Sequence, residues 1–300
     1  MNRLAKAMMT GNLIVTAECL PPRGSDYHEI EALASSLPEN LDAAVIADNP
    51  DAIRGSAFSA AVMLARKGRC AVLSMATRDR NRLALLSDAL GAAALNVAAI
   101  LCTSGAHACS VCPQAATAYD LDSVQFTQAV KRIVLYGAGM NGKPLEPGLD
   151  LQVGATAHPY LRPIELNLLR LKKKIIAGAD FLLTQPVFDL DGFSLWMRSV
   201  ESKDFDKRSA IIPSVLPITS LKRARALQDS QIYGPIPEEV IGRIGKARDE
   251  AAEGLAIAAE TAMRLQGMRG VRGIHILCGG CESTDERIRA VRHLTAALKS

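Results

Sequence analysis

Short runs of Val, Ile and Leu alternate with longer amphipathic stretches along the whole of this chain. Runs of this kind are typical of strands buried on both faces, and the stretches between them repeat apolar residues every three or four positions, as helices do. Strands separated by helices form a parallel sheet. We predict eight strands, at residues 13–20, 43–48, 70–76, 97–105, 151–156, 181–187, 210–218 and 273–278.

The helical repeat is clearest in residues 79–95, 123–135, 163–177 and 237–265. Asp189 and Ser283 precede two further helices and belong to the residue types that cap helix N-termini. Eight strand–helix units in 300 residues match the usual size of a closed (β/α)₈ barrel. No linker divides the chain, so we predict a single-domain TIM-type barrel over residues 1–300, with an open doubly wound sheet as the alternative.

Composition and charge narrow the class of protein. The 35 basic and 31 acidic residues are dispersed along the chain, which argues against a nucleic-acid partner but allows an anionic small molecule. No run of 18 apolar residues and no secretory signal pattern occurs, so we expect a cytoplasmic protein without a membrane span. Seven cysteines, an odd number, predict thiols or metal ligands and not a disulfide framework.

A barrel places its chemistry where the strands end at their C-termini. Glu18 lies in the first strand run, just before Pro21 and Pro22. Burial of this carboxyl group would raise its pKa toward the range of a general acid, and the alternative is a structural pairing with a nearby arginine such as Arg23. Gln185 ends the sixth strand run, where a buried amide can hydrogen-bond the edge of a heterocycle or can cap the chain.

Residues 137–142 match the G-x-G-x-x-G pattern of dinucleotide-binding folds. Lys143, Pro144 and Pro147 follow, so no helix can begin there, and we predict a turn within a surface loop over residues 137–148. Of the histidines, His107 and His158 fall at strand ends, whereas His275 is predicted as a hydrogen-bonded core residue.

Two Cys-x-x-Cys pairs, Cys109 with Cys112 and Cys278 with Cys281, both follow predicted strands. Together they could form a four-thiolate zinc or iron–sulfur site, with Cys19 and Cys102 as further candidate ligands. The alternative is unligated thiols or a redox pair, because the fourth and eighth strands lie on opposite sides of a barrel.

Several segments, taken jointly and in order, resemble the methylenetetrahydrofolate reductase family. They are TAECLPPRG (16–24), ADNP (47–50), TRDRNR (77–82) with SDALGA (87–92), YDLDSVQ (119–125), LKKK (171–174) with AGADFLLTQ (177–185), and GIH (273–275). The resemblance implies a (β/α)₈ barrel that binds FAD. It also implies reduction of 5,10-methylenetetrahydrofolate to 5-methyltetrahydrofolate by hydride from the reduced flavin, with NAD(P)H or a protein as electron donor.

The resemblance also implies roles for individual residues. Glu18 matches the family's catalytic glutamate, Gln185 matches a glutamine that contacts the folate, and Leu221 falls where an aromatic residue can pack on the substrate. Lys173 and Lys174 match basic positions near the flavin phosphates. The flavin pocket implied in this way is formed by Asp48, Ser74, Gly105, Tyr119, Ala155, His158, Arg170, Lys173 and Lys174.

The chain departs from the family pattern around the expected flavin ring. Ala106 follows Gly105 where the family commonly has an aspartate, and Ser74 replaces a His or Gln. The loop after the fourth strand carries Cys109 and Cys112. Two hypotheses follow: an FAD-dependent folate oxidoreductase, or a flavin-less folate-binding methyl-transfer protein or metal-binding subunit of a larger redox complex. A homo-oligomer or a complex is compatible with either.

Overall fold

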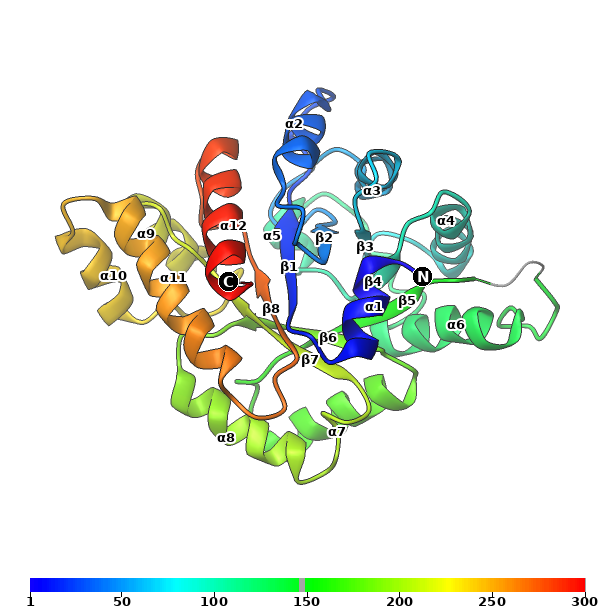
Figure 1. The fold of residues 1–300 in the computed structure, drawn as a ribbon. Helices are drawn as coiled ribbons and strands as arrows, with labels where there is room; N and C mark the ends of the chain where they lie inside the picture. The colour runs from blue at the N-terminus through cyan, green and yellow to red at the C-terminus, as the bar shows by residue number, and fades with distance from the viewer. Residues whose placement is uncertain (146–148, 300) are drawn as a thin grey trace.

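Eight parallel strands close into a barrel, with the helices packed around the outside (Figure 1). The computed structural model describes residues 1–145 and 149–299. The strands follow one another in sequence order around the barrel, and β1 pairs with β8 to close it. This confirms the predicted (β/α)₈ barrel and excludes the open sheet. The strands are β1 Ile14–Cys19, β2 Ala43–Ile46, β3 Ala71–Ala76, β4 Ala99–Thr103, β5 Gln152–Ala157, β6 Phe181–Pro186, β7 Ala210–Val215 and β8 Gly273–Ile276.

The described helices are α1 Arg3–Thr10, α2 His28–Ser36, α3 Ala57–Arg66, α4 Arg82–Ala94, α5 Ala108–Val111, α6 Ser123–Tyr136, α7 Ile164–Ile176, α8 Leu190–Glu201, α9 Leu221–Ser230, α10 Glu238–Lys246, α11 Glu250–Gln266 and α12 Thr284–Leu298. Asp189 and Ser283 cap α8 and α12 as predicted. The single helix predicted over residues 237–265 is wrong. The helix ends before Ala247, and a new one starts after Asp249, whose side chain accepts from the backbone N–H of Ala252.

The N-terminal half of the barrel interior is filled by apolar side chains. Ile14, Val72, Phe181 and Ile212 pack there against Leu4 of α1. The Phe181 ring fits because β5 has a glycine opposite it: a Cβ at Gly154 would lie 2.3 Å from the ring. Among the described residues, these side chains therefore leave no room for a ligand in the N-terminal half of the barrel interior.

Polar side chains form the next layer of the interior. Thr16 of β1 and His275 of β8 share a hydrogen bond of 2.9 Å between Oγ1 and Nδ1. Burial lowers the pKa of His275 to about 3, so the imidazole is neutral at physiological pH. His275 is thus the hydrogen-bonded core residue that the sequence predicts.

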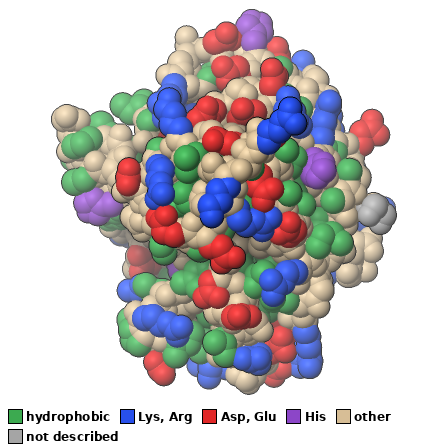
Figure 2. All heavy atoms as spheres, turned by 90° about the vertical axis from the view of Figure 1, so that its left-hand side faces the viewer, with side chains coloured by type: hydrophobic (Ala, Val, Ile, Leu, Met, Phe, Trp, Pro, Cys, Tyr) green, Lys and Arg blue, Asp and Glu red, His purple; other side chains and the backbone are tan. Residues whose placement is uncertain are grey.

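The glycine motif forms a turn, as predicted. Gly137 ends α6 with a φ of 56°, and Ala138 bridges Pro144 in the segment that follows. The last part of the predicted loop, residues 146–148, lies outside the described residues. In the described chain, no helix has the length and apolarity needed to cross a membrane. Acidic and basic side chains are interspersed on the face shown in Figure 2.

Candidate active site

A cavity of about 200 Å³ opens at the C-terminal end of the barrel and is lined by both Glu18 and Gln185. We call it the central cavity. Its floor and walls are largely apolar, with Val45, Leu101 and Leu183 contributed by β2, β4 and β6. The acid of the first strand and the amide of the sixth therefore face one hollow, as a shared ligand site requires.

Glu18 is 8% exposed and is held by the loop that follows β8. Its Oε2 accepts from the backbone N–H of Cys278 at 2.8 Å and of Gly279 at 3.1 Å. Burial raises the pKa of Glu18, and these two N–H groups and the charge of Arg287 only partly oppose it. Its other oxygen, Oε1, has no hydrogen-bond partner among the described residues.

The alternative role for Glu18, a pairing with Arg23, is wrong. Arg23 instead donates to Asp51 at 3.1 Å. Gln185 is half-buried and shares a hydrogen bond with His158, while capping of the following helix falls to Asp189. Burial and the nearby charge of Lys174 lower the pKa of His158 to about 4. A neutral imidazole therefore holds the Gln185 amide.

Tyr233 is the residue of this cavity that the sequence analysis missed. It lies in the loop between α9 and α10, lines the central cavity, and crowds the loop that holds Glu18: a Cβ at Gly279 would lie 2.0 Å from its hydroxyl. Leu221, which the resemblance placed against the substrate, is not among the residues lining this cavity. It begins α9 and packs toward α10, where a Cβ at Gly245 would lie 3.1 Å from its Cδ2.

A second cavity, of about 420 Å³, adjoins the central one and shares residues 156–158 with it. We call it the α7 cavity, because Arg170, Lys173 and Lys174 of α7 line it. Lys174 donates to the backbone oxygen of Thr156 at 2.6 Å, and burial lowers its pKa to about 8. Arg170 and Lys173 are exposed and have no ion-pair partner in the described part of the chain. The three cations that the sequence singled out thus border one cavity.

Two arginines of the loop after β3, Arg78 and Arg80, contact the segments that follow β2 and β4. Asp48 accepts from Arg80 at 2.6 Å and from the backbone N–H of Ala76 at 2.9 Å. Arg78 is 2% exposed and donates to the backbone oxygen of Ala106 at 2.8 Å. Asp48 is therefore committed to Arg80, and the backbone at Ala106, where the family commonly has an acid, contacts a guanidinium.

Of the other residues predicted to form a flavin pocket, some line a cavity and others do not. Ser74 lines the central cavity, and His158 lines both it and the α7 cavity. Gly105 has a φ of +81° and lies against Arg78. The Ala155 side chain packs in the core between the sheet and the helices, because its strand position points outward, so its assignment to the pocket is corrected. Tyr119 is 46% exposed and is not among the lining residues of either cavity.

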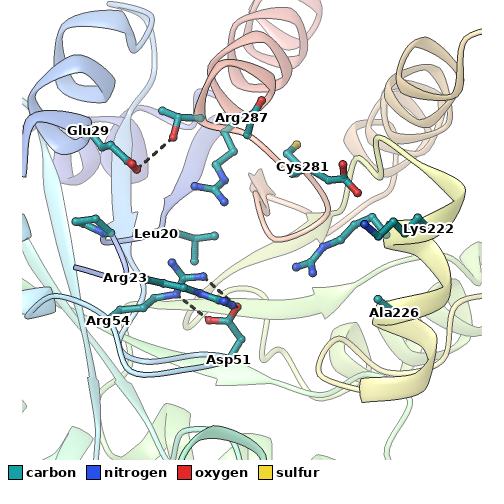
Figure 3. A pocket seen from close by; sticks show the side chains of 14 residues that line it. Leu20, Arg23, Glu29, Asp51, Arg54, Lys222, Ala226, Cys281 and Arg287 are labelled. Carbon is teal, nitrogen blue, oxygen red and sulfur yellow. Dashed lines mark hydrogen bonds and ion pairs between the residues drawn. The ribbon is translucent and has the colours of Figure 1, made fainter. Parts of the chain in front are cut away.

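A third cavity, of about 590 Å³, lies between α12, α9 and the loops after β1 and β2 (Figure 3). We call it the α12 cavity. It is lined by five cationic residues, Arg23, Arg54, Lys222, Arg223 and Arg287, and by three acidic ones, Glu29, Asp51 and Glu282. Arg23 and Arg54 both donate to Asp51. Arg287 points into the cavity, and its buried Nε has no hydrogen-bond partner among the described groups. The excess of cations suits an anionic ligand.

The four paired cysteines do not come together. Cys278 and Cys281 are buried after β8, whereas Cys109 is exposed on α5, which follows β4 on the opposite side of the barrel. The residues that the structure describes include no group of three or more His, Cys, Asp or Glu able to hold a metal. The predicted site with four shared thiolates is therefore not formed in the described chain.

A buried acid and an amide share a cavity at the C-terminal face, and cationic cavities flank it. This is the arrangement of the active site in a (β/α)₈-barrel enzyme. The chain belongs to the methylenetetrahydrofolate reductase family, whose model, described as "Methylenetetrahydrofolate reductase", matches residues 3–289.

Curated relatives of this family align over part of the chain. Methylenetetrahydrofolate reductase 2 of Saccharomyces cerevisiae is 33% identical over 113 residues, which are 34% of this chain and 18% of the yeast protein. The 5,10-methylenetetrahydrofolate reductase of Escherichia coli is 28% identical over 131 residues, which are 42% of this chain and 43% of that protein. The matched segments thus span less than half the length of these relatives.

Solved structures share the fold. An uncharacterized protein from Clostridium thermocellum, which binds two copies of 5-methyl-5,6,7,8-tetrahydrofolic acid, superposes with a TM-score of 0.66 at 13% identity, over 98% of this chain and 99% of that one. A 2,3-dimethylmalate lyase superposes with a TM-score of 0.53 at 12% identity, over 100% of this chain and 88% of that one.

Proposed function

We propose that this chain, acting as one barrel domain, reduces 5,10-methylenetetrahydrofolate to 5-methyltetrahydrofolate with the help of FAD. The single observation that carries the proposal is the central cavity, into which Glu18 and Gln185 both project. Family membership supports the reaction class, and the Clostridium protein's folate ligand supports the substrate class.

Glu18 is the proton donor in this proposal. The substrate's bridging methylene must leave N10 so that the five-membered ring opens to an iminium at N5, and N10 must take up a proton as it leaves. Burial raises the pKa of Glu18, so its carboxyl keeps the proton to a higher pH than an exposed glutamate does. Because Oε2 accepts from two backbone N–H groups, the proton resides on Oε1, which has no partner among the described residues. That oxygen delivers the proton to N10.

Gln185 and Tyr233 position the substrate. The amide of Gln185, held by neutral His158, offers an N–H donor and a carbonyl acceptor to the edge of the pterin. Tyr233 presents its ring to the same cavity and packs on the substrate, the role that the resemblance gave to Leu221. The apolar walls exclude water from the reacting atoms.

The α7 cavity fits the phosphates of FAD. Arg170 and Lys173 are exposed cations without ion-pair partners in the described chain, and they border a cavity that shares residues 156–158 with the central one. They would bind the diphosphate, with Lys174 adding a third positive charge. A bound flavin would supply the hydride, and NAD(P)H or a protein donor would supply its electrons.

The α12 cavity would take the carboxylates of the folate glutamate. The turn at residues 279–281 borders both this cavity and Glu18, since Gly279 donates to Glu18 and Cys281 lines the α12 cavity. Arg287 has a positive charge and a buried N–H that is unpaired among the described residues, and it can offer both to a carboxylate. A folate bound with its pterin at Glu18 would thus place its anionic end beside Arg287.

Replacing Arg287 by Gln is expected to raise the KM for the folate about tenfold or more, because a hydrogen bond to a charged group contributes about 1.5–3 kcal/mol. Arg287 also lowers the pKa of Glu18, so the comparison is made at a pH where Glu18 is protonated in both proteins. The control is Arg225→Gln, because Arg225 pairs with Glu238 and does not line the α12 cavity. An unchanged KM in Arg287→Gln would contradict this placement of the carboxylates.

The test of the function is a spectrum and an assay on the same purified protein. We expect flavin absorbance, and anaerobic formation of 5-methyltetrahydrofolate when the flavin is reduced in the presence of 5,10-methylenetetrahydrofolate. Mass spectrometry identifies the product. A yellow protein that forms none would overturn the proposal.

The second candidate is a flavin-less folate-binding protein that serves methyl transfer or forms part of a larger redox complex. It is favoured by the pairing of Asp48 with Arg80 and by the contact of Arg78 with Ala106, because both engage groups expected to face a flavin ring. A colourless protein that binds folate without reducing it would establish this candidate in place of the first.

A further inference from the structure

The seven cysteines of this chain fall into two groups. Five have thiols whose pKa is raised by burial: Cys19, Cys70, Cys102, Cys278 and Cys281. Because the thiolate is the nucleophile in sulfur chemistry, such thiols react poorly. The other two are Cys109, which is exposed, and Cys112, which is half-buried. Solutes can therefore reach this pair, and neither the proposed function nor a metal site uses it.

Cys109 lies in α5, and Cys112, three positions on, follows the end of that helix with an extended backbone. The backbone N–H of Ser110 donates to the oxygen of His107 at 3.0 Å, and that of Cys112 donates to Ala108 at 2.8 Å. Because Ser110 and Val111 between the two cysteines are helical, helical geometry places the two Cα atoms about 5 Å apart. A disulfide requires Cα atoms about 4.4–6.8 Å apart, so the spacing of these two Cα atoms allows the thiols to be linked.

The segment that carries the pair is anchored at both of its ends. Arg78 donates from its guanidinium to the backbone oxygen of Ala106 and accepts at its own backbone oxygen from the N–H of Ala118. Apart from the buried Ala108, the residues between these anchors are exposed or half-exposed. A covalent link within the turn therefore leaves the barrel unchanged.

We propose that Cys109 and Cys112 form a thiol–disulfide exchange site that reacts with small-molecule disulfides of the glutathione class. One protein thiolate attacks the external disulfide, whose S–S bond breaks and releases one thiolate, giving a mixed disulfide. The second protein thiolate then attacks the protein sulfur of that bond and releases the other external thiolate. The protein pair loses two electrons, the external disulfide gains them, and the two protons pass from the protein thiols to the released thiolates.

The segment that carries the two cysteines begins and ends beside residues that line the α7 cavity. Ser104 and Asp122, which line that cavity, flank the segment that carries the two cysteines. Oxidation therefore stiffens a loop beside the proposed phosphate site. The exchange itself requires neither folate nor flavin, so its test is separate from that of the proposed function.

The test equilibrates the native full-length protein in buffers from reduced to oxidised glutathione, then alkylates the free thiols in denaturant after an acid quench. In oxidising buffer we expect five alkylated cysteines in place of seven, with the link mapped by peptide mass to Cys109 and Cys112. In reducing buffer we expect all seven to be alkylated.

Cys109→Ser removes one partner from an exposed position, so the fold is retained. In this variant we expect a stable mixed disulfide of glutathione on Cys112 and no internal link. The matched control, Cys70→Ser, should form the Cys109–Cys112 link as the unaltered protein does. Seven free thiols after oxidation, a link through Cys278 or Cys281, or a mixed disulfide as the end product in the unaltered protein would each overturn the proposal.

Discussion

Replacing Glu18 by Gln is expected to lower the turnover of 5,10-methylenetetrahydrofolate by at least about 10²-fold, the usual contribution of a general acid. Glutamine keeps the size of the side chain, and its amide oxygen can still accept from the backbone N–H groups of Cys278 and Gly279. What it loses is the proton on Oε1. The change therefore isolates acid catalysis from folding and from ligand binding.

The role of Glu18 as an acid also predicts how turnover depends on pH. Burial raises the pKa of Glu18, so the carboxyl is protonated at low pH and loses its proton as the pH rises through that raised pKa. Turnover should fall over the same range. In Glu18→Gln the low residual rate should lack this fall, because no proton leaves the residue.

Glu18→Gln lowers turnover, but it should not lower the thermal stability of the protein. Above its raised pKa, Glu18 carries a buried charge that weakens the fold, and Gln does not. We therefore expect Glu18→Gln to unfold at an equal or higher temperature, with the difference growing toward alkaline pH. Turnover close to that of the unaltered protein, with the alkaline fall intact, would remove Glu18 from the role of proton donor.

The barrel could be predicted because each strand is marked locally, by a run of apolar residues between amphipathic stretches. Glu18 and Gln185 could be placed at its mouth for the same reason, since a strand's end fixes where its last side chains lie. Tyr233 could not be found in this way. It lies in a loop, and only the packing of that loop over Gly279 brings its ring to the central cavity.

Contacts between residues far apart in the sequence explain the other differences between the predicted site and the structure. Asp48 ends a strand, as a ligand-binding acid would, yet Arg80 from the next loop occupies its carboxylate. Nothing in the spacing of these residues indicates that pairing. The direction of Ala155, outward toward the helices, depends on the register of β5 within the closed barrel, and a strand shifted by one residue would reverse it.

A close approach between two backbone segments is the feature least visible in sequence. It leads to a second substitution with a large expected effect, this time on the free energy of unfolding. Gly254 lies in α11, where a Cβ would come within 1.7 Å of the backbone oxygen of Ile218. Gly242 lies in α10, and a Cβ there would meet nothing within 4 Å. Both are glycines within helices, but their surroundings are opposite. Alanine at the two positions should therefore have opposite effects.

Gly254→Ala is expected to destabilise the protein by about 3 kcal/mol, the upper part of the range for overpacking, because a backbone carbonyl cannot move aside as a side chain can. Gly242→Ala should instead stabilise it by up to about 1 kcal/mol, through helix propensity alone. Denaturant unfolding followed by circular dichroism measures both changes. The strain in Gly254→Ala should also reach the active site, because Thr219, next to Ile218, donates its backbone N–H to the oxygen of Gly280 in the loop that binds Glu18. Equal changes in unfolding free energy for the two variants would contradict this packing of α11.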